Sequence, residues 1–256
     1  MKKSLYINSD LDRQPTDTNS KWTTYLTQPF DFTQFKQISV GLKNIQIPNT
    51  AYNFSNYNNK IWYELMEGGM PHLYSINVRT DKHYENVNDW MKDLNDDCEH
   101  NLLFTFSTAT KKISVKNNLG LQMRMLSSYI YENHMPNNGN GRLGITKNIG
   151  NWINAGDTQT FFNMPKLIRT NCYYLCCDII DKTGEIPYPY FNPLILNKFT
   201  TRNFGELIDT VYDTVKYVGV ADRTIDKLSF YVIDDELETV DFNGSHITFE
   251  LEFIVE

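Results

Sequence analysis

The closing stretch of the chain, Thr224–Glu256, constrains the fold more than any other part of the sequence. Apolar and polar residues alternate along it, with Ile247, Phe249, Leu251, Phe253 and Val255 on one parity. An alternation with a period of two predicts a β-strand that buries one face. A strand this apolar needs neighbours in a sheet and a second layer over its buried face, so the rest of the chain must supply both.

The chain has 256 residues, of which 41% are hydrophobic, and this is enough for one large all-β domain or two small domains. Its 16 Tyr and 15 Phe suit strands better than helices. The formal charge is −7, and Lys and Arg are scattered, so the sequence predicts no direct nucleic-acid partner. No apolar run reaches the roughly eighteen residues that span a bilayer, so we expect no membrane span.

Further alternating segments predict about ten strands in all. Before the closing stretch they cover 4–8, 21–28, 37–47, 60–65, 73–79, 103–107, 112–116, 161–168 and 173–180. A first short helix is predicted at Val87, Trp90, Met91 and Leu94, with Asn86 as its N-cap. A second is predicted over Phe204–Tyr212, where Asn203 and Glu206 resemble a capping box. The Asn- and Gly-rich stretch 136–156 is expected to be an exposed loop.

This pattern of many strands, few helices and no internal repeat predicts an all-β fold, a single jelly-roll β-sandwich with an inserted segment and one or two short helices. We expect 1–83 to hold the first part of the roll with an N-terminal arm, and 84–156 to be an insertion or long loops. The rest of the roll is expected over 157–256.

The sequence contains no recognisable catalytic motif. Gly139–Gly144 matches the letters GxGxxG, but no strand precedes it and no helix follows, so no nucleotide site is predicted. The four cysteines are interpreted as structural thiols, and no two histidines have the i, i+2 spacing of a jelly-roll metal site. The acidic residues Asp234, Asp235, Glu236 and Glu238 are interpreted as a solvated turn. We therefore predict no catalytic, cofactor-binding or metal-binding residues, no cofactor and no enzymatic activity. The four cysteines of the chain are Cys98, Cys172, Cys176 and Cys177, and its five histidines are His72, His83, His100, His134 and His246.

Two stretches carry a family resemblance. The first runs from Asp17 to Phe32 and on through Gln37–Phe54, ending in the motif Ile47-Pro-Asn-Thr-Ala-Tyr-Asn-Phe54. The second is Val240-Asp-Phe-Asn-Gly-Ser-His-Ile-Thr-Phe-Glu-Leu251. Together they resemble the opening strands and the last strand pair of the penton (minor capsid) proteins of virophages and Polinton-like DNA viruses, and among these the Mavirus-like virophages.

The resemblance implies a structural protein of the virion, synthesised and assembled in the host cytoplasm. It implies a homopentamer at the fivefold vertices of an icosahedral double-stranded DNA virus, in contact with the major capsid protein. One alternative stays open, a trimeric jelly-roll attachment or carbohydrate-binding module. Its sites would be exposed aromatic residues such as Trp62, Trp152 or Tyr190.

Overall fold

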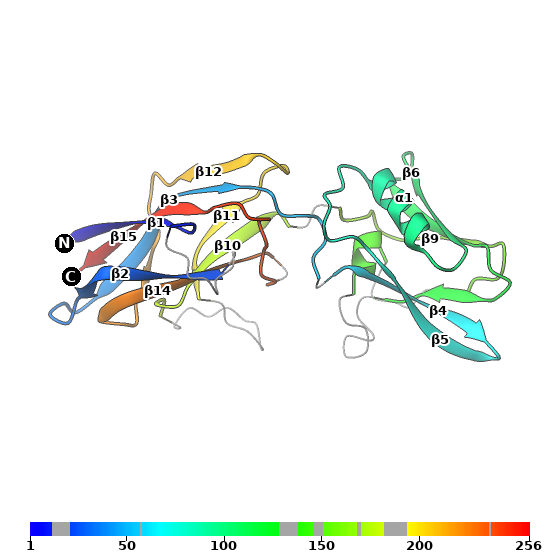
Figure 1. The fold of residues 1–256 in the computed structure, drawn as a ribbon, viewed down its shortest axis with the longest axis horizontal. Coiled ribbons are helices and arrows are strands. Elements are labelled where there is room, and N and C mark those ends of the chain that lie inside the picture. The colour runs from blue at the N-terminus through cyan, green and yellow to red at the C-terminus, as the bar shows by residue number, and fades with distance from the viewer. Residues whose placement is uncertain are drawn as a thin grey trace. The chain divides into compact units, whose positions relative to one another are not determined.

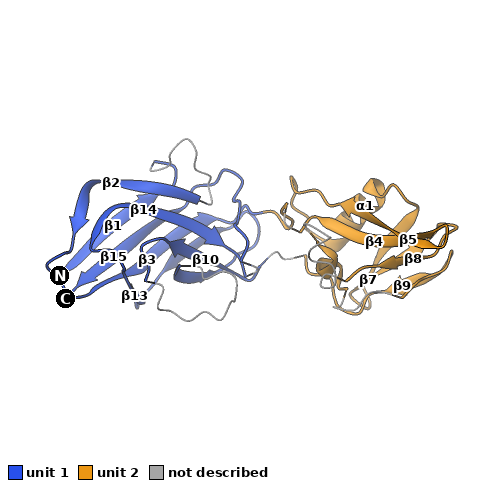
Figure 2. Cartoon of the chain, turned by 90° about the horizontal axis from the view of Figure 1, so that it is seen from below, with its two compact units in different colours: residues 1–51, 170–256 blue, residues 52–169 orange. Residues whose placement is uncertain are grey.

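The computed structural model describes residues 1–11, 21–56, 58–127, 138–145, 151–167, 170–181, 194–235 and 237–256. The chain forms two compact units, which are coloured separately in Figure 2. Unit 1 comprises Met1–Ala51 and Thr170–Glu256, and unit 2 comprises Tyr52–Arg169. The chain therefore leaves unit 1 once and returns once, so unit 2 is an insertion into unit 1.

Unit 1 is a sandwich of two antiparallel sheets (Figure 1). Its strands are β1 (Lys2–Asn8), β2 (Lys21–Asp31), β3 (Ile38–Pro48), β10 (Cys172–Cys177), β11 (Ile195–Thr200), β12 (Leu207–Val211), β13 (Tyr217–Gly219), β14 (Thr224–Ile233) and β15 (Thr248–Val255). One sheet has the order β1-β15-β3-β12, with β13 also paired to β3, and the other has the order β11-β10-β14-β2.

This strand order is that of a jelly roll. With the three-residue β13 set aside, the first, eighth, third and sixth strands of unit 1 form one sheet, and the fifth, fourth, seventh and second form the other. Eight strands that alternate between two sheets in this way make up the paired Greek keys of the jelly roll. The predicted all-β class and jelly-roll sandwich are confirmed, and unit 2 is inserted between the third and fourth strands of the roll.

The core of unit 1 is aromatic and lies between the two sheets. Phe249 of β15 is fully buried, and its ring lies 5.0 Å from that of Phe230 on β14 and 6.1 Å from that of Trp22 on β2. The alternation in the closing stretch thus places Phe249 against the opposite sheet, as the sequence predicts, while Thr248 and Glu250 face outward.

Unit 2 has its own core and its own sheets. The first sheet has the order β5-β4-β8 and the second β6-β7-β9. The elements are β4 (Lys60–Glu67), β5 (Met70–Asn77), α1 (Val87–Asp97), β6 (Leu102–Ser107), β7 (Lys112–Asn117), β8 (Met123–Met125), η1 (Asn140–Leu143, a 3₁₀ helix) and β9 (Thr158–Thr160). The helix α1 confirms the first predicted helix: the side chain of Asn86 accepts a hydrogen bond from Asp89 N, and Trp90, Met91 and Leu94 are buried.

The second predicted helix, over Phe204–Tyr212, is wrong. Leu207–Val211 is the strand β12, which pairs antiparallel with β3. The expected contact between Asn203 and Glu206 does form, since Asn203 N donates to the Glu206 carboxylate at 3.2 Å, but it closes a turn at Gly205, whose φ is +81°. Pairing with the edge of a sheet therefore overrides a local periodicity that also fits a helix.

The compact units divide the chain differently from the expected segments 1–83, 84–156 and 157–256. Strands β4 and β5, expected in the first part of the roll, pair with each other and pack into the core of unit 2. The strand predicted over 161–168 is wrong for the part of it that the structure describes, because β9 ends at Thr160. Unit 2 is therefore larger at both ends than the expected insertion.

We expect Phe249→Ala to lower the free energy of unfolding by about 3–5 kcal/mol, because it leaves a cavity between the two sheets. Thr248→Ala on the outward parity of the same strand is expected to cost less than about 1 kcal/mol. Denaturant titration of both variants measures the two costs. Equal losses at the two positions would refute the assignment of faces in β15.

Candidate functional site

The motif Pro48–Phe54 is the segment by which the chain passes from unit 1 to unit 2. Its first half is fixed to unit 1. The buried Asn49 donates from its side-chain amide to the carbonyl of Arg202 and accepts a hydrogen bond from the Tyr173 hydroxyl at 3.0 Å. The Thr50 hydroxyl donates to Phe242 O and lies 2.8 Å from the Ser245 hydroxyl. Asn49 thus ties the end of β3 to β10 and to the segment before β12, and Thr50 ties it to the turn that precedes β15.

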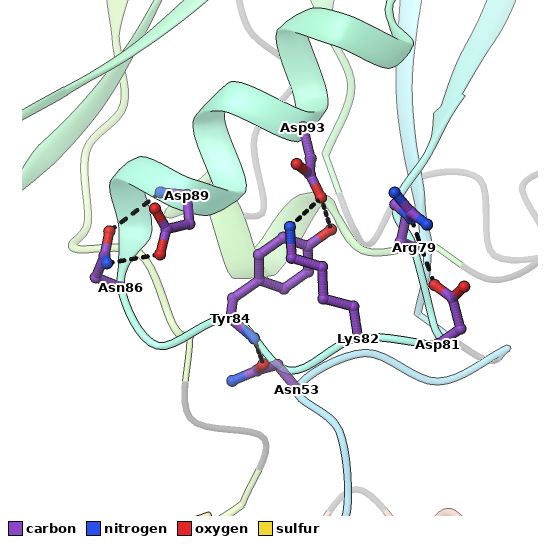
Figure 3. A network of polar contacts seen from close by, with 8 residues as sticks. All are labelled: Asn53, Arg79, Asp81, Lys82, Tyr84, Asn86, Asp89 and Asp93. Atoms are coloured by element: carbon purple, nitrogen blue, oxygen red, sulfur yellow. Dashed lines mark hydrogen bonds and ion pairs between the residues drawn. The ribbon is translucent and has the colours of Figure 1, made fainter.

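The second half of the motif is fixed to unit 2 (Figure 3). Asn53 accepts a hydrogen bond from Tyr84 N at 2.6 Å and donates to Leu167 O at 3.0 Å. The Phe54 ring lies 4.9 Å from that of Trp90 and 5.8 Å from that of Tyr84, and Phe54 is almost fully buried. Asn49, Thr50, Asn53 and Phe54 of the motif thus each have a fixed place in one unit, which explains these residue types.

A polar cluster beside this segment holds the middle of α1 in place (Figure 3). Asp93 accepts hydrogen bonds from the Tyr84 hydroxyl at 3.0 Å and from Lys82 Nζ at 2.8 Å. Burial raises the pKa of Asp93, but the hydrogen bonds from Lys82 and Tyr84 outweigh it and lower the pKa overall. Burial also raises the pKa of Tyr84. The cluster thus pairs a neutral phenol with an ionised carboxylate and anchors α1 to the segment that precedes it.

The outward face of the β1-β15-β3-β12 sheet carries a ladder of paired charges. Lys2 lies 3.0 Å from Glu252, and Tyr217 donates to the same carboxylate. Lys43 lies 2.9 Å from Glu250. Hydrogen bonds from Tyr217 and Lys2 lower the pKa of Glu252, and the hydrogen bond from Lys43 lowers that of Glu250. The strands β1, β15 and β3 of this face are thus joined by charged pairs that cross from strand to strand.

Three of the four cysteines lie in β10. This agrees with their interpretation as buried thiols in a strand. Cys172, Cys176 and Cys177 are buried, and burial raises the pKa of Cys176 to about 12 and that of Cys177 well above its ordinary value. Burial also raises the pKa of Cys98, which is partly exposed. Cys98, Cys176 and Cys177 are thus protonated at neutral pH and are poor nucleophiles.

The histidines that the structure describes do not converge. His72 is exposed, and His100 bonds the Tyr63 hydroxyl and lies edge-on to Tyr74 at 4.6 Å. Burial lowers the pKa of His83. His246 Nδ1 lies 3.5 Å from Asp10 Oδ1 on the surface, and His134 lies outside the described residues. Among the described residues no group of three or more His, Cys, Asp or Glu side chains could hold a metal ion.

The exposed loop expected over 136–156 is wrong for the Gly139–Gly144 segment. It forms the 3₁₀ helix η1, in which Asn140, Arg142 and Leu143 are buried. The Asn140 side chain accepts from Trp62 N and donates to Trp62 O, both at 2.7 Å, so it continues the hydrogen bonding of β4. No strand-loop-helix unit surrounds these glycines in the described part of the chain, and they serve the packing of unit 2.

The acidic turn is only partly solvated. Asp234 is 1% exposed, and its carboxylate accepts from Glu238 N at 3.0 Å while its own N–H donates to Glu238 O. It therefore closes a turn in which Leu237 has a φ of +65°. Asp235 lies in the same turn, and Glu236 lies outside the described residues.

Two of the three aromatic residues considered for an attachment site are described, and neither is fully exposed. Trp62 is partly buried, and Trp152 is partly buried with the Arg124 guanidinium 4.6 Å from its ring centre. Tyr190 lies outside the described residues. One open groove on unit 1, of about 400 Å³, is lined by Lys198, Arg202, three threonines and the rings of Phe199 and Tyr212. A groove of about 470 Å³ on unit 2 runs between α1 and β6.

No helix in the described ranges is both long and apolar enough to cross a membrane. No protein-family model matches the chain, and no curated protein sequence does. Among solved structures, the chain matches the crystal structure of the selenomethionine-labelled mavirus penton protein, with a TM-score of 0.48 and 10% sequence identity over 100% of each chain. That protein belongs to the family that the two end stretches resemble.

Gly139→Ala is expected to destabilise unit 2 by about 1–3 kcal/mol, because a Cβ at this position would overlap the carbonyl of Asn58. Gly141→Ala in the same segment is the matched control, since Gly141 is exposed, and its effect should stay within about 0.5 kcal/mol. Thermal or denaturant unfolding of the two variants compares them. A neutral Gly139→Ala would contradict the packing of η1 against the start of β4.

Acid should weaken unit 1 through Glu250 and Glu252. Their pKa values in the folded chain are lowered from the ordinary 4.5, so their stabilising effect is complete above that value and is lost as the pH falls through the folded-state pKa. We expect the wild-type chain to lose more stability between about pH 6.5 and about pH 3.5 than the Glu250→Gln/Glu252→Gln variant does. Urea titrations at both pH values test this, and parallel losses in the two proteins would refute it.

Proposed function

We propose that the chain is a structural capsid protein, the penton that fills the fivefold vertices of an icosahedral double-stranded DNA virus as a homopentamer. In this proposal it contacts the major capsid protein around it, is assembled in the host cytoplasm and resides in the virion. It acts through its surface and has no enzymatic activity.

One observation carries the proposal: the two stretches that resemble penton proteins lie against each other in unit 1. Thr50 and Ser245 are 195 residues apart in the chain, yet their hydroxyls are 2.8 Å apart, and Asn243 donates to Thr50 O. The strands β3 and β15 from the same two stretches are paired, with Ile45 opposite Phe249. Chance similarities would have no reason to fall on one contiguous part of a fold. Here they fall on its central strand pair and on the exit to the insertion.

The architecture suits a vertex protein. A jelly roll is rigid and presents sheet edges and end loops, and a ring of identical subunits needs two different surfaces that fit each other on every copy. Unit 2 has its own core, so its surface can change without altering the roll. The trimeric attachment module shares the fold, but the partial burial of Trp62 and Trp152 gives that alternative no specific support.

The mass of the purified oligomer tests the proposal. Native mass spectrometry is expected to show five copies of the 29.9 kDa chain, and the pentamer should bind the major capsid protein of the same virus in a co-sedimentation assay. A trimer would instead favour the attachment module. A monomer that persists at high concentration and does not bind the major capsid protein would contradict the vertex assignment.

A further inference from the structure

The strands β1 and β12 form the two opposite edges of one sheet in unit 1, and β12 lies at the margin of that unit in Figure 1. Met1 and Val255 exchange backbone hydrogen bonds, and Ser9 N donates to Ile247 O. The odd-numbered residues of β1 therefore bond β15, and the even-numbered ones point their N–H and C=O groups away from the sheet. No described strand pairs with that side of β1.

The strand β12 has the same geometry. Tyr212 N donates to Lys43 O, and Glu206 O accepts from Asn49 N, so the even-numbered residues face β3. The backbone groups of Leu207, Asp209 and Val211 point away from the sheet, where no strand among the described residues pairs with them. Each edge thus offers a row of backbone donors and acceptors of the kind that recruits another strand.

Exposed apolar side chains occupy matching positions on the two edges. Tyr6 on β1 is 63% exposed and Val211 on β12 is 70% exposed. Both lie in one row across the outward face of the sheet, because Tyr6 is opposite Glu250, Glu250 is opposite Asn44, and Asn44 is opposite Val211. A second copy placed beside the first without a shift along the strands would bring its Tyr6 next to Val211 of the first copy.

The charges favour a contact between β1 of one copy and β12 of another over a contact between two identical strands. The exposed residues of β1 include Lys2 and Lys3, whereas Asp209 on β12 and Asp213 just after it are exposed acids. β12 ends at Val211, and Asp213 lies in the bend that follows, toward the end of the next copy's β1 that carries Lys2 and Lys3. Two β1 edges or two β12 edges would instead bring like charges together.

The strand directions also allow β1 of one copy to pair with β12 of another. The pairs β1·β15, β15·β3 and β3·β12 are all antiparallel, so β1 and β12 run in opposite directions. Two copies in the same orientation therefore meet as an antiparallel pair, in which Tyr6 and Val211 both direct backbone groups into the contact. The contact joins two different surfaces, so repeating it gives a ring when the rotation closes.

We propose that β1 of one copy pairs antiparallel with β12 of a second copy, with Tyr6 opposite Val211, and that this edge-to-edge contact joins the subunits of the oligomer. The inference rests on the proposed homopentamer and names the surface that would build it. The contact extends one sheet across the subunit boundary and buries two apolar side chains that a single copy leaves in water.

The test uses two single variants and their combination in the full chain. Tyr6→Lys and Val211→Asp each replace an apolar side chain of the contact by a charged one and should raise the dissociation constant of the oligomer by at least about tenfold. Tyr6→Lys/Val211→Asp places the new charges opposite each other and should recover most of the lost affinity. Tyr25→Asp is the matched control, because Tyr25 is 61% exposed on the edge strand β2 of the other sheet, opposite Lys227, and it should leave assembly unchanged.

Sedimentation analysis and native mass spectrometry give the dissociation constant and the subunit number together. Loss in both singles, recovery in the double variant and no effect of Tyr25→Asp support the contact. A pentamer that is insensitive to all the variants would overturn the edge contact and leave the vertex function intact. A ring of another size that responds as expected would uphold the contact and contradict the pentamer. A wild-type monomer, or single variants whose loss the double variant does not reverse, would overturn the inference.

Discussion

The pairing of β15 with β1 on one side and β3 on the other is the constraint on which unit 1 depends. It brings the first and last strands of the chain side by side, from Lys2 opposite Ile254 to Asn8 opposite Thr248. It also fixes the buried parity of β15, so that Phe249 and Phe253 meet the aromatic rings of the opposite sheet. Because these contacts join residues far apart in sequence, the sandwich closes only when its last strand is in place.

The start of the insertion is also held by contacts within the roll. The chain leaves the roll at the end of β3, where Asn49 and Thr50 are fixed by hydrogen bonds to residues of the later strands and turns. Asn53 and Phe54 are then fixed within unit 2, whose core is built around Trp90, Tyr63 and Phe104. Because each unit has its own core, the inserted unit can vary in sequence without altering the core of the roll.

The sequence predicts those elements in which the periodicity and the end signals agree. Helix α1 has both an apolar face and a capping Asn86, and β15 has an unbroken alternation, and both predictions are confirmed. Phe204–Tyr212 has an equally good helical face, but an open sheet edge at β3 decides its conformation, and a local pattern does not contain that edge. Asn140 looks like a loop residue by composition, and only its bonds to β4 show that it is buried. The shared row of Tyr6 and Val211 required the register of three strand pairs, which no local pattern encodes.

The position of this chain in an assembled particle is the test of whether it is, as we propose, a capsid vertex protein. The measurement is an electron cryomicroscopy reconstruction of particles assembled from this chain and the major capsid protein of the same virus. If the proposal is right, we expect density for five jelly rolls around each fivefold axis, with each roll in contact with the major capsid protein. Vertices filled by another protein, or density for this chain only at other positions of the particle, would contradict it.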